Sequence, residues 1–410
     1  MAGASRASLA RNIEDSGGAR RVWVERLQLT NFRNYAHVTL AVDPRPVVVA
    51  GANGSGKTNL LEALSLLAPG QGLRRTAYAE LARTGTSGWA VAARVNVPAG
   101  TVDVGTGLEN ASGGRAGRTV RINGATGTAA SALADVGEVL WLTPSMDGLF
   151  TGPGSERRRF LDRLIASFDP GYRVLVARFE RAMQQRNRLL MDDVRDAVRF
   201  EGLERLMADA AVAIAAARRA TVAELAAAIR RRRDGASSAA FPWAELSLIG
   251  TLETALQRAP AIDVEDGYAA ELAASRERDR AARRTLTGPH RSDLVVGHGP
   301  KQMPASGCST GEQKALLIGL VLAHADLVAG RTQAAPILLL DEVAAHLDAF
   351  RRGLLFEEVL ALGGQAWLSG SDAAAFSELA ERAQLLHVEA GSITAARWGA
   401  SLQASPTIIY

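Results

Sequence analysis

The spacing of apolar residues changes twice along the 410-residue chain. Residues 22–29 have a strand-like pattern, and alternation continues over residues 37–42. A short apolar run at residues 47–50 then leads into a glycine-rich loop, which is followed by leucines at helical spacing. This order predicts a buried strand, a loop and a helix.

The middle of the chain divides into a strand-rich part and a helix-rich part. Short alternating segments over about residues 85–143, separated by Gly and Asn, predict an antiparallel sheet that includes Val139–Leu142. From about residue 155 to 285, long arginine-rich segments at helical spacing predict amphipathic helices. One break near Phe241–Leu248 has the pattern of a strand.

The α/β pattern returns after residue 285. It predicts helices over residues 309–329 and 348–362, and buried strands at Ile337–Leu340, Ala366–Ser369 and finally Leu385–Val388. A chain of this length is expected to form two or three structural units. The sequence therefore predicts an α/β domain that is interrupted by a helical lobe.

Composition indicates a globular protein of a reducing compartment but does not identify the function. Apolar residues make up 47% of the chain and charged residues 22%, as in an ordinary globular protein. The formal charge of +4 is compatible with a nucleic-acid partner but is weak evidence for one. The single cysteine, Cys308, allows no disulfide within one chain and suits a reducing cytosol. Without a run of about 18 apolar residues, we expect no membrane span.

The glycine-rich loop matches the phosphate-binding pattern GxxxxGK[ST] in full and lies between a strand and a helix. Glycines let successive backbone N–H groups turn toward phosphate oxygens, and the helix N-terminus adds its dipole. Lys57 is expected to neutralise β- and γ-phosphate charge as a catalytic residue, and the Thr58 hydroxyl to bind Mg²⁺. The predicted ATP-binding residues are Gly51, Ala52, Asn53, Gly54, Ser55, Gly56, Lys57 and Thr58.

Two carboxylates end the predicted strand at Ile337–Leu340. Adjacent side chains at a strand end point apart, so Asp341 is expected to bind Mg²⁺ while Glu342 faces the attacking water as general base. An acidic strand end alone is often structural. Its combination with a complete phosphate-binding loop favours the catalytic interpretation.

A third segment opens the helix predicted at residues 309–329. Ser309 and Glu312 have the spacing of a capping box, and this interpretation holds with or without a function. The segment also resembles the ABC signature, in which a serine hydroxyl, a glycine N–H and the helix N-terminus bind a γ-phosphate held by another subunit. That resemblance assigns nucleotide contacts to Ser309, Gly311 and Glu312, although Cys308 and Thr310 depart from the pattern.

The order of the motifs defines a subclass. Residues 345–348 resemble the ABC D-loop and add Asp348 to the candidate nucleotide-binding residues. The phosphate-binding loop and the acidic pair lie much farther apart than in transporter ATPases, as in SMC-like proteins. The insert of about 130 residues shows no sustained heptads, which favours a compact lobe over a coiled coil. Residues 369–372 lack the switch histidine of many ABC proteins, so γ-phosphate sensing would fall to Ser371, Asp372 or another group.

Further segments resemble the RecF family over roughly residues 22–390. They are LTNFRNY at 29–35, RRRFLD at 157–162, QRN at 185–187 and GPHRSD at 288–293, where Ser292 replaces an Asp. The resemblance implies an ABC-type ATPase head with an inserted α-helical lobe. We accordingly predict a flexible N-terminal tail (1–20), an N-terminal ATPase part (21–154), a helical lobe (155–285) and a C-terminal ATPase part (286–400).

The same resemblance implies a function in recombinational gap repair. RecF-like proteins bind ATP, dimerise around two nucleotides, bind double-stranded DNA at single-strand gaps, and help load RecA with RecR and RecO. Slow, DNA-dependent ATP hydrolysis resets this clamp. The implied cofactors are ATP and Mg²⁺, the implied location is the cytoplasm at the nucleoid, and no membrane partner is implied.

Charge by itself leaves the DNA contacts open. Residues 155–200 hold 11 Arg against 7 Asp and Glu, and Arg178, Arg181 and Arg188 recur at helical spacing. These arginines could follow a phosphate backbone with little sequence preference, or form a solvated face with ion pairs. Other hypotheses are a transporter ATPase, a clamp that hardly turns over, and an SMC-like nuclease-associated ATPase. Neither a nuclease carboxylate cluster nor metal-ligand spacing around His290 and His346 is apparent in the sequence.

Overall fold

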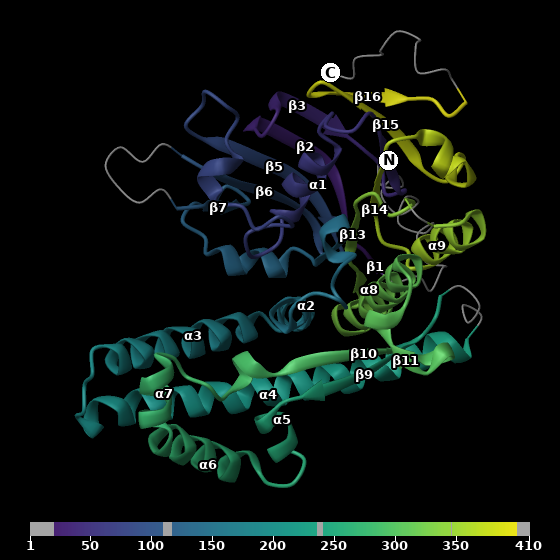
Figure 1. Cartoon of the computed structure of the whole chain (residues 1–410). Helices are drawn as coiled ribbons and strands as arrows, with labels where there is room; N and C mark the ends of the chain where they lie inside the picture. The colour runs from purple at the N-terminus through teal and green to yellow at the C-terminus, as the bar shows by residue number, and fades with distance from the viewer. Residues whose placement is uncertain (1–19, 110–116, 236–240, 346, 400–410) are drawn as a thin grey trace, which may run out of the picture.

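The computed structural model describes residues 20–109, 117–235, 241–345 and 347–399. An α/β head forms one end of the molecule and a mainly helical lobe the other (Figure 1). The predicted tail, apart from residue 20, and His346 of the D-loop segment lie outside the described residues.

A six-stranded sheet forms the centre of the head. Its order is β16-β15-β4-β14-β13-β8, and all neighbours are parallel except the edge pair β15 and β16. The strands are β4 (Val47–Ala50), β8 (Val139–Leu142), β13 (Ile337–Leu340), β14 (Ala366–Gly370), β15 (Gln384–Glu389) and β16 (Ser392–Ala396). Parallel strands are apolar on both faces because both faces are covered, and β4 and β13 are buried at every residue.

The sequence prediction was wrong for two features of this sheet. Val139–Leu142 forms β8, which pairs in parallel with β13 and is not part of the antiparallel sheet. Its alternation identified a strand but could not identify its partner, because pairing depends on residues almost 200 positions away. Leu385–Val388 lies in a strand as predicted, but β16 follows it as an antiparallel edge strand.

The second sheet of the head is antiparallel, with the order β3-β2-β5-β6-β7. Its strands are β2 (Trp23–Phe32), β3 (Tyr35–Ala41), β5 (Trp89–Val97), β6 (Gly100–Leu108) and β7 (Thr119–Ile122). Short strands β1 (Arg20–Arg21) and β12 (Ala334–Ala335) pair in parallel beside it. Leu60, Leu61 and Leu64 of helix α1 (Lys57–Ser65) join a core cluster that includes strands of both large sheets. The helix after the phosphate-binding loop is therefore enclosed by the head.

Helices cover the opposite face of the parallel sheet. The central one, α8 (Thr310–Thr332), belongs to the core cluster that contains Leu338 and Leu340, whereas Leu339 faces the other cluster. By length and hydropathy α8 could cross a membrane, but 67% of its most apolar window is buried inside the protein. A core helix explains this composition. Helix α9 (Ala349–Ala361) follows the D-loop.

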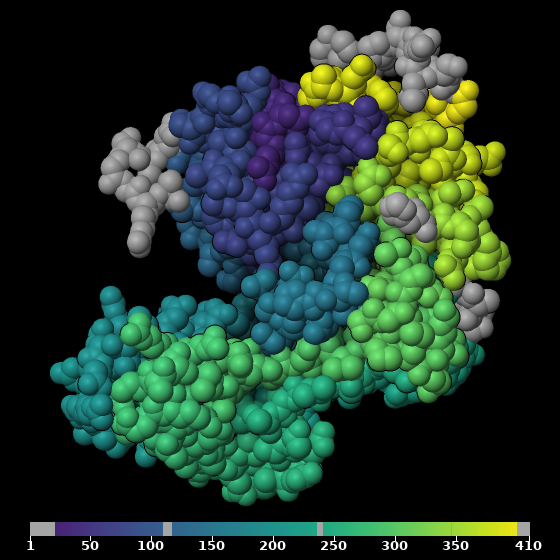
Figure 2. All heavy atoms as spheres, viewed as in Figure 1, coloured from purple at the N-terminus to yellow at the C-terminus, as the bar shows by residue number. Residues whose placement is uncertain are grey.

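The lobe contains six helices and a small sheet among the described residues (Figure 1). In the space-filling view it is the teal and green part of the molecule, below the head (Figure 2). The helices are α2 (Gly154–Ala166), α3 (Pro170–Met191), α4 (Ala197–Asp234), α5 (Thr251–Ala255), α6 (Ala261–Ala274) and α7 (Arg276–Ala282). Strands β9 (Ala244–Ile249), β10 (Asp293–His298) and β11 (Met303–Pro304) form an antiparallel sheet in the order β11-β10-β9. A strand does occupy the predicted break in the helical pattern.

Short 3₁₀ turns connect these elements. They are η1 (Tyr78–Leu81), η2 (Ala130–Asp135), η3 (Pro144–Met146), η4 (Pro289–Arg291), η5 (Gly299–Lys301), η6 (Ala305–Gly307) and η7 (Ala373–Leu379).

A fully buried arginine joins the helices of the lobe. Arg186 forms ion pairs with Glu204 of α4 at 3.0 Å and Asp279 of α7 at 2.8 Å. It also donates to the Leu272 carbonyl and to the Thr285 hydroxyl. All of its hydrogen-bonding nitrogens are therefore used inside the lobe, so this residue of the QRN segment has a structural role.

We predict that Arg186→Leu lowers the free energy of unfolding by about 3–5 kcal/mol, because it removes the close cation of the fully buried Asp279 and one of the two arginines that pair with Glu204. Chemical denaturation followed by circular dichroism measures this change. The control is Arg188→Leu, two residues along the same helix at an exposed position, which should change stability by less than about 0.5 kcal/mol. Equal effects of the two substitutions would contradict the assignment.

Candidate nucleotide-binding site

The phosphate-binding loop lies between β4 and α1. Gly51 has a φ of 156°, and a Cβ there would lie 2.2 Å from the Val388 carbonyl oxygen. Gly56 has a φ of 123°, and a Cβ there would lie 2.5 Å from Asn34 Nδ2. Side chains are thus excluded at both positions, by backbone conformation and by space. The exposed turn between them, residues 52–54, is open to a ligand.

Two residues of the NFRNY segment donate hydrogen bonds to the backbone of this loop. Asn34 Nδ2 donates to the Ser55 carbonyl at 2.9 Å, and the Tyr35 hydroxyl donates to the Gly56 carbonyl at 2.9 Å. The neighbouring Arg33 forms an ion pair with Glu62, which is buried in α1. The segment was recognised from its resemblance alone, and the structure now gives it a physical role. It fixes the loop and the first turns of α1.

The N-terminus of α1 has no side-chain cap. Its N-cap residue is Gly56, which has no side chain that could accept a hydrogen bond from the first turn. The free N–H groups of a helix start attract anions, and the helix dipole adds to this effect. Ser55 Oγ is buried and has no partner among the described residues. These unsatisfied donors fit a phosphate group.

The acidic pair lies beside this loop. The Thr58 hydroxyl donates to Asp341 Oδ1 at 3.0 Å, although the two residues are 283 positions apart in the sequence. Lys57 Nζ donates to the Gly51 and Ala52 carbonyls at 2.8 and 3.1 Å, and lies 3.4 Å from Glu342 Oε1. The structure therefore brings together the lysine, the threonine and both carboxylates of the predicted site.

Glu342 has an unusual backbone conformation. Its φ of 48° is uncommon for a residue other than glycine, and such conformations persist where surrounding contacts impose them. One of these contacts is a hydrogen bond from the Glu342 N–H to Ser369 Oγ at 2.9 Å. The Ser369 hydroxyl in turn donates to Asp341 Oδ1 at 2.6 Å. One buried serine thus positions both members of the acidic pair.

Ser369 was missed as a site residue by the sequence analysis. The absence of a switch histidine favoured Ser371 and Asp372 as γ-phosphate sensors. Both residues are exposed, and Asp372 caps the turn η7. The sequence did contain a feature that could have identified Ser369, because it is a polar residue near the end of a predicted buried strand. Its relevance depends on β14 lying directly beside β13, which the sequence did not reveal.

The signature segment lies at the exposed start of α8. Ser309 is the N-cap and forms the predicted capping box with Glu312. Glu312 also forms an ion pair with Lys301 at 2.6 Å. This ion pair, together with the hydrogen bonds from Ser309, lowers the pKa of Glu312 to about 2. In the described part of the chain, neither Ser309 nor Glu312 forms a hydrogen bond or ion pair with the phosphate-binding loop.

The signature helix is tied to the segment that follows the acidic pair. Lys314 is buried, and its Nζ donates to the carbonyls of Glu342 at 3.1 Å and Ala345 at 2.8 Å. Burial lowers the pKa of Lys314. Asp348, predicted to contact nucleotide, is exposed and caps α9 by accepting from the Arg351 N–H at 2.8 Å. The signature helix and the D-loop segment are therefore mechanically connected.

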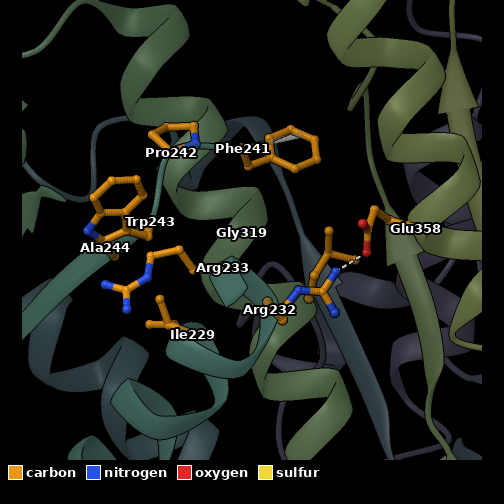
Figure 3. A pocket seen from close by; sticks show the side chains of 10 residues that line it. Ile229, Arg232, Arg233, Phe241, Pro242, Trp243, Ala244, Gly319 and Glu358 are labelled. Carbon is orange, nitrogen blue, oxygen red and sulfur yellow. Dashed lines mark hydrogen bonds and ion pairs between the residues drawn. The ribbon is translucent and has the colours of Figure 1, made fainter. Parts of the chain in front are cut away.

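The other side of α8 packs against the lobe. A small cavity of about 40 Å³ lies there between α4, the start of β9, α8 and α9, lined in part by Trp243 and Gly319 (Figure 3). Arg232 of α4 points toward Glu358 of α9 and forms ion pairs with it and with Asp326 of α8. These contacts couple the position of the signature helix to the lobe.

The two most distinctive segments of the sequence meet where the lobe joins the head. Arg157 binds Asp293 through two hydrogen bonds, of 2.9 and 2.6 Å, and Arg158 donates to the Ser292 carbonyl. The Ser292 hydroxyl donates to the buried Glu253 at 2.7 Å. A carboxylate at position 292 would face Glu253 directly, which gives a physical reason for serine at this position.

Comparison with known proteins agrees with the fold. Residues 23–366 match the RecF/RecN/SMC N terminal domain family. The chain is 53% identical to the DNA replication and repair protein RecF of Mesorhizobium japonicum, over 90% of this chain and 97% of that protein. It is 52% identical to the protein of the same name from Agrobacterium fabrum, over 92% and 99% of the two chains.

Solved structures show the same architecture at lower identity. A structure described as the recombination mediator protein RecF-ATPrS in the RecFOR pathway superposes with a TM-score of 0.81 at 18% identity, covering 93% of this chain and all of that one. The Smc head domain of Pyrococcus furiosus gives a TM-score of 0.52 at 16% identity, covering 92% and 96%.

The fold and the site together define an ABC/SMC-type ATPase head with an inserted lobe, as the motif order predicted. The phosphate-binding loop, the signature helix and the acidic pair occur in one chain in that order. The chain belongs to the RecF family of DNA replication and repair proteins. These relatives do not support the alternative of a transporter ATPase.

We predict that Ser369→Ala weakens the response of ATP hydrolysis to Mg²⁺. The substitution removes one hydrogen bond to Asp341 and one from the Glu342 N–H, so the two carboxylates lose their shared support. The maximal rate should fall about tenfold and half-saturation should need more Mg²⁺, while the affinity for ATP changes little. A Mg²⁺ titration of phosphate release, with separate ATP-binding measurements, tests this. A larger effect of Ser371→Ala would contradict the role given to Ser369.

Proposed function

We propose that this chain is an ATP-dependent DNA-binding protein of recombinational gap repair, and that it acts as a homodimeric clamp around two nucleotides. The observation that carries the proposal is that one head contains both a phosphate-binding helix without a side-chain cap and a signature helix with an exposed N-terminus. Each chain would present both halves of a nucleotide site, since among the described residues Ser309 and Glu312 form no hydrogen bond or ion pair with the phosphate-binding loop of their own chain. A second copy would complete each site.

The residues around the phosphate-binding loop fit ATP with Mg²⁺. Gly51–Thr58 would bind the triphosphate through backbone N–H groups, with Ser55 Oγ as a further donor. Thr58 and Asp341 would hold Mg²⁺, since their oxygens lie 3.0 Å apart, about the separation of neighbouring ligands in an octahedral shell. When bound, the metal ion would neutralise negative charge that develops on the phosphates.

The protein groups suggest an order of events. Lys57 lies against the loop carbonyls and Glu342, so binding of a triphosphate would draw its ammonium group toward the β- and γ-phosphates. Glu342 then loses its cation and becomes free to accept a proton from the attacking water. The Ser369 hydroxyl and the main chain keep Glu342 beside the site throughout. In this scheme the base becomes available only when nucleotide is present.

An exposed aromatic residue just after the D-loop segment supports the proposal of a dimer. Phe350 is 69% exposed, two residues after Asp348, although phenylalanine is usually buried. Ser309, Gly311 and Glu312 would contribute to the partner's nucleotide, and Asp348 would lie at the same contact. The Ser309–Glu312 capping bonds would have to open when Ser309 contacts a phosphate, which would make closure reversible.

The relatives carry the DNA-repair part of the proposal. Close relatives are named as DNA replication and repair proteins, and a structural neighbour is described as a recombination mediator of the RecFOR pathway. We propose the corresponding partners here: double-stranded DNA at single-strand gaps, RecR, and RecO and RecA in the same pathway. The location would be cytoplasmic, at the nucleoid, and hydrolysis would be slow and DNA-dependent.

The predicted division into parts is retained as a working proposal: a tail (1–20), the ATPase segments 21–154 and 286–400, and the lobe (155–285). The small sheet crosses the border between residues 285 and 286, since β10, after this border, pairs along its whole length with β9, before it. Movement of the lobe would therefore reach the signature helix directly.

We predict that Glu342→Gln slows ATP hydrolysis by about 10² or more and gives a more persistent ATP-bound dimer on DNA, because the amide cannot accept the proton of water. Phosphate release measures the first effect, and analytical ultracentrifugation with gapped DNA measures the second. Glu201→Gln, at an exposed position of the lobe, is the matched control. Unchanged hydrolysis would show that Glu342 is not the base.

We predict that Phe350→Ser weakens ATP-dependent dimerisation about tenfold or more without changing the affinity of the monomer for ATP. The aromatic ring would lose its buried position in the dimer, whereas the phosphate-binding loop is untouched. Sedimentation with and without ATP tests this, with Val198→Ser as a control at another exposed apolar residue. A wild-type chain that remains monomeric under every condition would refute the shared site.

A further inference from the structure

Two neighbouring cavities line helix α2 where the lobe meets the head. The larger, of about 340 Å³, is lined by Arg74, Arg75, Arg159 and Arg163, with Glu156 as its only acidic residue. The smaller, of about 190 Å³, is lined by Arg158, Arg159, Arg218 and His290 together with Asp162 and Glu180. Arg159 lines both cavities, so the basic surface is continuous over α2.

The three arginines of the RRRFLD segment have different surroundings. Arg157 is bound to Asp293, and Arg158 donates to the Ser292 carbonyl. Arg159 forms no hydrogen bond or ion pair with another residue in the described ranges, and neither does Arg75 across the larger cavity. Both side chains are exposed. Arg157 and Arg158 thus tie α2 to β10 and the residue before it, and Arg159 has no such role.

Positive charge in the larger cavity is only partly compensated by the protein, since Arg74 pairs with Glu62 at 3.3 Å and Glu156 lines the cavity, whereas Arg75 and Arg159 form no ion pair among the described residues. Burial and, after it, repulsion from Arg159 lower the pKa of Arg75. Burial and repulsion from Arg75 lower the pKa of Arg163 to about 9. Arg163 stacks on Trp141 at 4.9 Å and on Phe160 at 5.5 Å, which fixes its guanidinium group at the wall. Grouped cations of this kind are relieved when an anion binds between them.

The position of the cavity connects it to the ATPase site. Its rim includes Thr143, which directly follows Leu142, and the Leu142 carbonyl accepts the Asp341 N–H at 2.9 Å. On the other side, Arg74 donates to Asn59 Oδ1 of α1 at 2.7 Å. An occupant would therefore contact segments that support both the metal-binding carboxylate and the phosphate-binding helix.

We propose that Arg75, Arg159 and Arg163 bind backbone phosphates of DNA, and that this contact couples DNA binding to ATP hydrolysis. This inference rests on the proposed function. The two cavities share Arg159, so their charge matches a polymer with phosphates at regular intervals better than a single nucleotide, whose phosphates the loop at Gly51–Thr58 already binds. Contacts to phosphates carry no sequence information, so the proposed contact is independent of sequence.

The test uses the full chain and a fluorescent duplex that contains a single-strand gap. Wild type, Arg159→Gln and Arg75→Gln are compared by fluorescence anisotropy over about 50 to 200 mM salt, with ATP present. Each variant should bind this DNA about tenfold more weakly and reduce the slope of log affinity against log salt by about one. Arg159→Lys should restore most of the affinity, because it keeps the charge. DNA stimulation of ATP hydrolysis should fall in parallel.

The rival surface is α3, so Arg181→Gln is the matched comparison: it removes one exposed lobe arginine that has no ion pair in the described part of the chain. Wild-type affinity in both cavity variants, or an equal loss in Arg181→Gln, would overturn the inference while leaving the proposed function intact. Loss of affinity for a fluorescent ATP analogue with DNA binding retained would overturn it as well, and would make the cavity part of the nucleotide site. A wild-type chain that does not bind the duplex would refute both proposals.

Discussion

Parallel pairing of β4, β14 and β13 is the constraint on which the site depends. Because these strands run in one direction, their carboxyl ends meet at the same edge of the sheet, where the phosphate-binding loop and the acidic pair emerge. The strands can lie in the middle of the sheet only because both faces are covered. The enclosed α1 covers one face and the buried α8 covers the other.

The same arrangement explains how a small polar network holds the acidic pair beside the phosphate-binding loop. Ser369, at the end of β14, reaches both Asp341 and the main chain of Glu342 because β14 lies directly beside β13. Lys57 of the phosphate-binding loop completes the network through its ion pair with Glu342. Lys57 already contacts the loop carbonyls and Glu342, so in our proposal a triphosphate would enter by replacing these interactions. This exchange would link nucleotide binding to the release of the base.

Mechanical links run from this edge into the lobe. Lys314 ties the signature helix to the segment after the acidic pair, and Arg232 ties the same helix to α4 and α9. The pairs formed by Arg157 and Arg158 join α2 to β10 and the residue before it. A ligand on the lobe and a ligand in the head therefore act on a shared set of contacts, which is what a DNA-responsive ATPase requires.

The sequence by itself determined the features that depend on neighbouring residues. These include the phosphate-binding loop, the acidic strand end, the capping box at Ser309 and the helix predicted at 309–329, which the structure has at Thr310–Thr332. Backbone N–H groups, helix ends and apolar periodicity are local properties. Tertiary structure alone decided which strands pair and which distant side chains meet. The parallel place of β8, the contact of Thr58 with Asp341, the role of Ser369 and the unpaired state of Arg159 all depend on residues far apart in the chain. Periodicity shows that a face is buried but does not name the partner that buries it.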